Sequence, residues 1–258
     1  MKRVPPGQIA LGIMCKVPRS GSSKTRLCPP LSADEAAELS RCFIADLAAS
    51  IKRVPEVHNV RGVAVYTPAN AEGELKDLLP PGFACLAQRG NGLGERLHNA
   101  TTDLLDAGFQ AACLINSDSP TLPSHILLGV IEALRQPAEH VVLGPSIDGG
   151  YTLVGLKRAR GALFREIAWS THEVLVQTLA RAGVLGLPVS LVPLWYDVDD
   201  VNSLQLLLQE LFGGGIGLHQ DPFGPPVAKR SRAFLVHLLA DSGRPGLSLP
   251  ARLEPPLR

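Results

Sequence analysis

The sequence has no long apolar run and no paired-cysteine motif. No stretch approaches the roughly 20 apolar residues that a bilayer-spanning helix needs, so we expect no membrane span. The five cysteines are odd in number and include no C-x-x-C pair, which predicts reduced, mostly buried thiols in a cytoplasmic protein. The run from Ile9 to Cys15 ends in Lys16 without a small-residue cleavage site, so we interpret it as a strand and not as a signal peptide.

Neither sign of charge is in excess. The formal net charge is +1, which gives no general attraction for nucleic acid or for an anionic membrane. Any recognition of phosphate must therefore be local, and we expect no nucleic-acid partner. Hydrophobic residues make up 45% of the chain and charged residues 19%, which is typical of a globular protein and excludes a disordered one.

Strand-like and helix-like segments alternate along residues 9–212. Continuous apolar strands between helices favour a mostly parallel sheet covered on both faces, which is an α/β fold. Ser32 with Glu35 three residues later matches a capping box and predicts the start of a long helix. The expected strands are 9–15, 60–67, 83–88, 111–115, 140–143, 151–156 and 189–194, and the expected helices are 32–52, 75–79, 94–107, 124–135, 171–182 and 201–212.

The composition changes after Phe212. Residues 213–258 hold seven glycines and seven prolines, and six Lys and Arg against three Asp and Glu. Such a composition favours an extended, partly disordered segment. Alternatively, a short apolar helix over residues 232–240 docks on the body or on another subunit. We predict one domain over residues 1–212 and an accessory, basic extension over residues 213–258.

The loop after the first expected strand is the most informative segment. Lys16, Lys24 and Arg26 crowd the end of this strand, together with the backbone N–H groups of a Gly/Ser loop. In an open α/β sheet, ligands bind at the carboxyl edge of the strands, and free N–H groups with fixed cations suit phosphate oxygens. The alternative is that these cations are solvated charges of a surface loop, as such residues usually are.

Two common nucleotide-binding motifs are incomplete. A Walker P-loop at Lys24 would need glycine where Ser23 and Pro18 stand, so we do not expect a kinase or ATPase of that class. The run from Gly90 to Gly94 is followed by Glu95, where a G-x-G-x-x-G loop needs its last glycine. This argues against a dinucleotide-dependent dehydrogenase.

Carboxylates follow the later strands. Asp118 comes after an apolar strand and is either a turn or helix-entry residue or a metal ligand. Asp148 begins an Asp-Gly-Gly turn signal, whose glycines would also let a ligand approach the backbone closely. Asp197, Asp199 and Asp200 would repel one another without a cation or an arginine beside them. Since Mg²⁺ takes one or two carboxylates together with substrate phosphates and water, the cations and carboxylates together suggest nucleotide chemistry.

The remaining polar motifs have structural interpretations. Read by itself, Trp169-Ser170-Thr171 is a helix start capped by Ser170 or Thr171. The seven histidines show no metal-site spacing, and no activating partner marks a cysteine as a nucleophile.

Six ordered motifs carry a resemblance to one family. They are Lys16-x-Pro18-x-x-Gly21-x-x-Lys24-Thr-Arg-Leu27, Gln88-Arg-Gly-x-Gly92-Leu-Gly-Glu-Arg96, Ser117-Asp-Ser-Pro120, Gly144-Pro-x-x-Asp148-Gly-Gly-Tyr151, Trp169-Ser-Thr171 and Asp197-Val-Asp199. Residues 9–210 thereby resemble the DUF2064 family, the arsenosugar-biosynthesis type of glycosyltransferase. That family is related to the molybdenum-cofactor and phospholactate guanylyltransferases. The resemblance implies a nucleotide-diphospho-sugar transferase (GT-A) fold, a Rossmann-like α/β sandwich.

One motif departs from the family pattern. Family members usually have Gly-Thr-Asp-x-Pro, where this chain has Asn116-Ser117-Asp118-Ser119-Pro120. Asparagine tolerates the left-handed conformation that glycine would take, so we expect the turn to survive. The side chain of Asn116 would narrow the pocket, which leaves the donor preference open.

The resemblance implies a role for each motif. Lys24, Arg26, Asp118 and Asp148 would be catalytic. Asp118, with Asp199 or Asp197, would hold Mg²⁺ or Mn²⁺. Nucleotide and substrate would be bound by Lys16, Pro18, Gly21, Thr25, Gln88, Gly92, Gly94, Arg96, Gly149, Gly150, Tyr151, Trp169, Ser170 and Thr171.

Three functions remain open at this point. The first is a metal-dependent glycosyltransferase that uses a nucleotide-sugar donor and a small-molecule acceptor. The second is a guanylyl- or cytidylyltransferase-like nucleotidyltransferase that joins an NTP to a small phosphorylated acceptor. The third is a non-catalytic nucleotide-binding module. The sequence leaves the acceptor, the base, the sugar, the metal and a homo-oligomeric state undecided.

Overall fold

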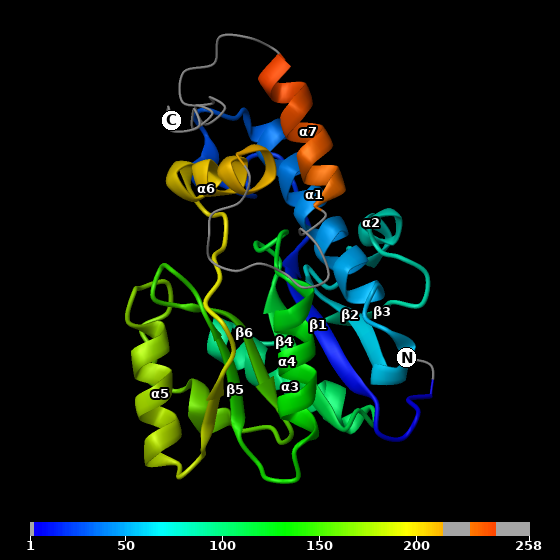
Figure 1. Ribbon diagram of the computed structural model, residues 1–258, viewed down its shortest axis with the longest axis vertical. Coiled ribbons are helices and arrows are strands. Elements are labelled where there is room, and N and C mark those ends of the chain that lie inside the picture. Colours follow the sequence, from blue (N-terminus) through cyan, green and yellow to red (C-terminus); the bar gives the residue numbers. More distant parts are fainter. Residues whose placement is uncertain (1–2, 214–227, 241–258) are drawn as a thin grey trace, which may run out of the picture.

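The computed structural model describes residues 3–213 and 228–240. Its centre is one seven-stranded sheet of order β3-β2-β1-β4-β6-β5-β7 (Figure 1). Strand β6 runs antiparallel to both of its neighbours, and the other pairs are parallel, so the expected mostly parallel α/β sheet is confirmed. The strands are β1 Ile9–Lys16, β2 Val60–Thr67, β3 Ala84–Ala87, β4 Ala111–Asn116, β5 Val141–Pro145, β6 Tyr151–Leu156 and β7 Val189–Leu191.

Helices occupy most of the remaining described chain. The first long helix begins as expected at a capping box, because Ser32 Oγ accepts from the Glu35 N–H and the Glu35 carboxylate accepts from the Ser32 N–H. The helices are α1 Ala33–Lys52, α2 Glu72–Leu75, α3 Leu93–Asp106, α4 Ser124–Arg135, α5 Val174–Val184, α6 Val201–Phe212 and α7 Lys229–Ala240. Short 3₁₀ helices lie at Thr25–Leu27, Glu56–His58, Lys76–Leu78 and Gly161–Phe164.

The sheet has an apolar core on each face. Side chains alternate along β1, so that Ile9, Leu11 and Ile13 pack on the face covered by α1, α4, α6 and α7. Ala10 belongs to the other core, which is covered by α3 and α5. Both faces of β1 are buried, so its residues are apolar at consecutive positions, which explains the continuous apolar run in the sequence.

A hairpin reverses the chain between β5 and β6. Residues 146–150 join these two antiparallel strands. Gly149 has φ +88°, and a Cβ at this position would lie 2.2 Å from the carbonyl oxygen of His172. Glycine is therefore required here by backbone conformation and by close packing.

Helix α7 lies alongside α1 (Figure 1). The expected helix at residues 232–240 therefore exists and docks on the body. Its N-terminus is held by the buried carboxylate of Asp46, which accepts from the N–H groups of Arg230 and Ser231 and from Ser231 Oγ at 2.7–3.0 Å. Leu235 and Leu238 are buried at this contact. The other residues of the predicted extension lie largely outside the described part of the chain.

Three expected boundaries are wrong. The helix expected over residues 75–79 is α2 Glu72–Leu75, followed by the 3₁₀ helix Lys76–Leu78. The helix expected from Thr171 begins at Val174, because Ser170 has a left-handed φ of 65°. Thr171 Oγ1 donates to Ala168 O and accepts from the N–H of Glu173, the residue before the helix. The strand expected over residues 189–194 ends at Leu191. Pro193 follows, and it has no N–H to continue the ladder.

The cysteines are unpaired thiols. Cys15, Cys42 and Cys113 are buried, and Cys28 and Cys85 are partly buried. Across residues 3–213 and 228–240, we find no helix that combines the length and the apolar character needed to cross a bilayer.

Candidate active site

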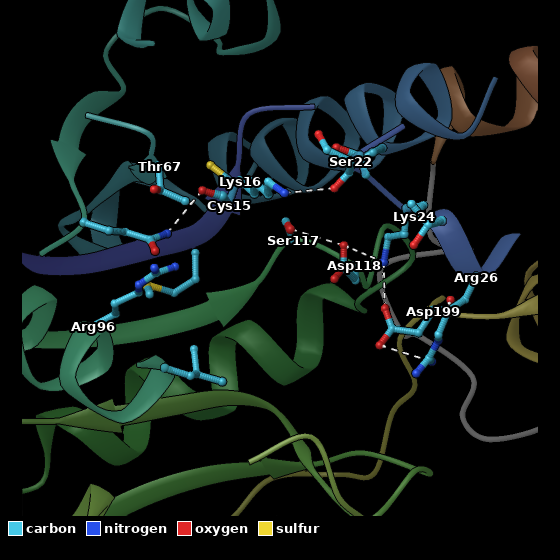
Figure 2. A pocket seen from close by; sticks show the side chains of 16 residues that line it. Cys15, Lys16, Ser22, Lys24, Arg26, Thr67, Arg96, Ser117, Asp118 and Asp199 are labelled. Atoms are coloured by element: carbon cyan, nitrogen blue, oxygen red, sulfur yellow. Dashed lines mark hydrogen bonds and ion pairs between the residues drawn. The ribbon is translucent and has the colours of Figure 1, made fainter. Parts of the chain in front are cut away.

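The carboxyl ends of the parallel strands meet at one edge of the sheet. Lys16 ends β1, Thr67 ends β2, Gln88 follows β3 and Asn116 ends β4. A cleft of about 410 Å³ opens at this edge (Figure 2). It is lined by Met14, Cys15, Lys16, Ser22, Ser23, Lys24, Thr25, Arg26, Ser40, Thr67, Gln88, Leu93, Arg96, Ser117, Asp118 and Asp199.

Two distant segments meet beside this cleft. The N–H of Val198 donates to Asp118 O at 2.9 Å. Ser119 Oγ donates to Tyr196 O at 2.8 Å, and Thr121 Oγ1 donates to the Tyr196 hydroxyl at 3.1 Å. These bonds join the segment after β4 to the segment after β7, and they bring the predicted acids of both segments to one place.

The Lys24 ammonium lies between these acids. Its Nζ is 2.8 Å from Asp118 Oδ1, 2.8 Å from Asp199 Oδ1 and 2.7 Å from Val198 O (Figure 2). The Lys24 side chain is only 7% exposed. Burial by itself would lower the pKa of Lys24, but the charges of Asp118 and Asp199 outweigh it and raise the pKa above its ordinary value. Lys24 is therefore a charged lysine within a cage of oxygen atoms.

The other cations lie around the same cleft. Lys16 Nζ donates to Ser22 O at 2.9 Å, which closes the loop between them. Arg26 is 65% exposed, with a guanidinium nitrogen 3.7 Å from Asp199 Oδ2. Arg96 lies at the opposite end of the cleft, near Thr67 (Figure 2). Positive charge is thus available on both sides of the cleft.

Gln88 is fixed at the ends of two strands. Its Nε2 donates to Cys15 O at 3.2 Å and to Val65 O at 2.7 Å. Its backbone N–H donates to Tyr66 O at 2.8 Å. The donors of this amide are therefore used within the protein, and the side chain forms a firm wall of the cleft.

A second pocket of about 300 Å³ shares Arg26 and Asp199 with the cleft. Asp148 and Asp197 line it, beside the apolar side chains of Ile147 and Leu206.

Ser146 and two acids set the state of Asp197. Ser146 Oγ donates to Asp197 Oδ1 at 2.9 Å. Burial, and then the charges of Asp148 and Asp199, raise the pKa of Asp197 to about 6, and the hydrogen bond from Ser146 opposes that rise. Ser146 was not predicted from the sequence, although it lies at a variable position of the Gly144–Tyr151 motif.

The structure thus brings together Lys16, Lys24, Thr25, Arg26, Gln88, Arg96, Asp118 and Asp199 in the cleft, and Asp148 and Asp197 in the second pocket. The remaining predicted binding residues, Pro18, Gly21, Gly92, Gly94, Gly149, Gly150, Tyr151, Trp169, Ser170 and Thr171, are not among the residues that line these two spaces.

Several of those residues have visible structural roles instead. The Gly94 backbone lies so close to Phe164 O that a Cβ would approach it to 2.7 Å. Tyr151 and Trp169 pack edge to face, with ring centroids 6.4 Å apart. Gly150 donates its N–H to Asp148 Oδ1 at 2.9 Å and so completes the turn. These contacts give the residues a structural role, and their predicted roles in binding stay predictions.

The turn before Asp118 differs from the expected one. Asn116 ends β4 in the extended conformation and is not left-handed. Its Oδ1 accepts from the Asp118 N–H at 3.3 Å. The turn is therefore made by Asn116, which leaves the Asp118 carboxylate free to contact Lys24.

Other cleft residues were missed because they occupy variable motif positions or strand ends. Ser22 and Ser23 lie within the first motif, and Thr67 is the last residue of an expected strand. Ser40 comes from α1, where nothing in the sequence marks it. Its helical position alone could have suggested no more than a surface or packing role.

The oxygen cage around Lys24 is suited to a divalent ion. Carboxylate and carbonyl oxygens are the donors that Mg²⁺ and Mn²⁺ prefer, and Asp118, Asp199 and Val198 O already surround one positive charge. Within residues 3–213 and 228–240, no three His, Cys, Asp or Glu side chains form a ready ligand set. Phosphate and water would thus have to complete the coordination.

A thiol is not the reactive group of this cleft. Burial, followed by the nearby Cys85 and Asp118, raises the pKa of Cys15 to about 12. The thiolate is the nucleophilic form, so Cys15 remains a neutral wall residue at physiological pH.

The chain matches one family model and is similar to solved structures. Residues 50–171 match the model of the family described as "Uncharacterized protein conserved in bacteria (DUF2064)", which confirms the resemblance over that range. A candidate nucleotide-diphospho-sugar transferase from Desulfovibrio desulfuricans G20 is 27% identical, with a TM-score of 0.76 over 92% of this chain and 96% of that one. No curated protein matches the chain significantly.

A more distant solved structure has the same fold. CMP:2-keto-3-deoxy-manno-octonic acid synthetase in complex with CTP is 11% identical, with a TM-score of 0.50 over 78% of this chain and 96% of that one. The chain therefore has the nucleotide-diphospho-sugar transferase fold, and by its similarity to the D. desulfuricans structure the protein is a transferase.

Proposed function

We propose that the protein is a divalent-metal-dependent glycosyltransferase that uses a nucleotide-sugar donor. The observation that carries this proposal is the meeting of Lys24, Asp118 and Asp199 within 2.8 Å at the carboxyl edge of the sheet. Fixed cations, hard oxygen donors and a cleft of about 410 Å³ lie together there. The similarity to the D. desulfuricans protein supports the donor class.

The cleft supplies what a nucleoside diphosphate needs. Lys16, Lys24 and Arg26 come from one loop and would pair with the phosphate oxygens, with Arg26 able to grip two of them at once. As the bond between sugar and diphosphate breaks, negative charge grows on the departing diphosphate. Side chains that neutralise this charge act mainly in the transition state.

Asp118 and Asp199 would hold the metal, with Val198 O as a neighbouring oxygen donor. When bound, Mg²⁺ or Mn²⁺ would act as a Lewis acid on the diphosphate. The protein's own contribution is to fix these acids, because the bonds of Val198 and Ser119 lock their two segments together.

We assign the acceptor to the second pocket. It shares Arg26 and Asp199 with the cleft, so an acceptor there would border the diphosphate end of the donor. Asp148 is our candidate for the base that takes a proton from the acceptor. Its carboxylate is exposed at this pocket and is oriented by the Gly150 N–H.

Metal-dependent hydrolysis or transfer of a panel of nucleotide sugars tests the proposal. We expect turnover with Mn²⁺ or Mg²⁺ for at least one donor, and its loss in Asp118→Asn, because that change removes a charged metal ligand. Circular dichroism and thermal unfolding check that the variant is folded. No turnover with any donor from folded wild-type protein would contradict the proposal, as would full activity of Asp118→Asn.

A nucleotidyltransferase would use the same fold and the same cations. It is distinguished by its product, since it would release pyrophosphate from an NTP in the presence of a phosphorylated acceptor. A non-catalytic module would bind nucleotide without any dependence on metal and would give no product from either class of donor.

A further inference from the structure

All three hydrogen-bond donors of the Lys24 ammonium are used within the protein. A lysine ammonium has three N–H groups, and Lys24 Nζ has three oxygen neighbours, on Asp118, Asp199 and Val198, at 2.7–2.8 Å. The ring of Phe43 covers it from another side, with its centroid 5.8 Å from Nζ. Lys24 therefore has no donor left for a phosphate, and the two carboxylates already have a cation.

We propose that Lys24 holds the place of the divalent cation in the ligand-free protein, so that a metal enters only together with a diphosphate that draws the ammonium out of the oxygen cage. This inference rests on the metal assignment of the proposed function. It adds that free metal and Lys24 exclude each other, and that the ligand recognised is a metal–diphosphate complex.

Charge explains why the two cations compete. Two carboxylates and one ammonium carry a net charge of −1, so the cage is close to balanced without a metal. A divalent ion on the same oxygens would lie directly against the ammonium. Because the Lys24 side chain is only 7% exposed, two cations at such short range repel strongly. Lys24 must therefore leave before the metal can bind well.

A diphosphate removes this conflict. Its oxygens offer new acceptors to the three Lys24 donors, and its negative charge compensates the added metal. Lys24 is already among the residues that line the cleft, so its side chain has open space beside it. Figure 2 shows it at the border between the acids and the loop from Lys16 to Ser22. A lysine side chain has four flexible carbons and can make this change without a movement of the sheet.

The neighbouring cations do not have this role. Lys16 Nζ is bonded to Ser22 O, and Arg26 lies outside the cage, largely exposed, beside Asp199. Lys24 has an unusual left-handed backbone (φ 51°) at the start of the 3₁₀ helix Thr25–Leu27. This conformation directs one cation of the loop inward while the others stay at the rim of the cleft.

Calorimetric titration of the full-length protein tests the exchange. MnCl₂ alone, and MnCl₂ premixed with an equimolar amount of pyrophosphate, are titrated into wild type, Lys24→Met and Lys52→Met. We expect Mn²⁺ alone to bind wild type weakly, and to bind Lys24→Met at least about tenfold more tightly, within the usual range of coupling between two sites. Lys52→Met is the matched control, because it removes the same charge from an exposed lysine at the end of α1, outside the cleft, and we expect a change below about twofold.

In Lys24→Met, pyrophosphate should no longer increase the affinity for Mn²⁺. Wild type should bind the Mn²⁺–pyrophosphate mixture at least about tenfold more tightly than Mn²⁺ alone, whereas Lys24→Met should show little difference. Equal or weaker binding of Mn²⁺ to Lys24→Met would overturn the proposal. So would a wild-type protein that binds Mn²⁺ alone as tightly as the mixture.

The test remains decisive if Lys24→Met does not fold. Lys24→Gln, which is neutral but keeps two N–H donors, serves as a second variant, and the wild-type comparison needs no variant at all. No sugar donor or acceptor is present, so the outcome is independent of turnover. Exchange without any glycosyl transfer would reject the proposed function only, and glycosyl transfer without exchange would reject this inference only.

Discussion

At the scale of single residues, the site is an arrangement of charges that partly compensate. Lys24 balances Asp118 and Asp199. Asp197 has no cation partner among the described residues and accepts a hydrogen bond from Ser146. A buried carboxylate near like charges favours its protonated form. Burial beside like charges therefore raises the pKa of Asp197 above its ordinary value.

The raised pKa of Asp197 predicts a specific pH dependence of stability. Its folded-state pKa is about 6, against an ordinary value of 3.8. Stability from this group is thus fully present below about pH 4 and is lost as the pH rises through 6. Asp197→Asn resembles the protonated form, so we expect it to be more stable than wild type by roughly 1–3 kcal/mol at pH 7 and equal to it near pH 4.

Denaturant unfolding at pH 4, 5, 6 and 7, in the presence of EDTA, measures this difference. Asp106→Asn is the control, because it removes an exposed carboxylate from the surface of α3. If the free energies of unfolding of wild type and Asp197→Asn differ by the same amount at every pH, the pKa of Asp197 is not raised in the folded protein.

At the scale of elements, close packing explains residues that the motifs suggested were ligand-binding. Gly94 in the first turn of α3 lies against Phe164 O and the Trp169 ring. Gly92, the N-cap of the same helix, has open space around its Cβ position. Close packing therefore requires glycine at position 94 but not at position 92, although both belong to one motif.

We expect Gly94→Ala to destabilise the protein by about 1–3 kcal/mol, since a new methyl group would have to displace backbone. The matched change Gly92→Ala should cost at most about 1 kcal/mol, because alanine is a poorer N-cap than glycine but meets no atom. Urea unfolding compares the two. Equal effects at both positions would contradict the packing argument.

Helix α7 is attached to α1 by a buried polar contact. Asp46→Ala would leave the N–H groups of Arg230 and Ser231, and Ser231 Oγ, without their acceptor. We expect a loss of about 1–3 kcal/mol from these unpaired donors, and faster trypsin cleavage after Arg230 and Arg232. Glu38→Ala removes an exposed acid of α1 and is the control. Unchanged cleavage in Asp46→Ala would show that other contacts hold α7.

At the scale of the whole molecule, the sheet joins the two parts of the site. Strands β1 to β4 carry the cleft, while β5 and the segment after β7 supply Asp148, Asp197 and Asp199. A donor that contacts both parts would bind only the native arrangement. Such binding raises apparent stability by mass action.

We therefore expect nucleotide sugars to raise the melting temperature in a metal-dependent way. At a ligand concentration of 100 times Kd the gain is about 2.7 kcal/mol, which corresponds to roughly 5–10 °C for a chain of this size. Thermal-shift measurements with and without Mn²⁺ check this, with Asp118→Asn as the control that should lose the metal-dependent part. Shifts that are identical with and without Mn²⁺ would argue for the non-catalytic alternative.

Much of the fold could be predicted because the relevant signals are local. The capping box at Ser32, the apolar run of β1 and the turn at Asp148 each lie within a few residues of the structure they form. The start of α5 could not be predicted, because the Thr171 hydroxyl bonds Ala168 O and the Glu173 N–H in a turn that precedes the first helical residue. Competing local hydrogen bonds of this kind leave no trace in periodicity.

By itself, the sequence determined which residues carry charge at strand ends and which segments become strands or helices, since propensity, capping and apolar pattern act over short distances. Only the tertiary structure decided that Lys24 lies between Asp118 and Asp199, although Lys24 and Asp199 are 175 residues apart. That contact depends on the pairing of β1 with β4 and on the bonds between residues 118–121 and 196–198. Strand order and long-range hydrogen bonds follow from how the whole core packs, which no local stretch of the chain specifies.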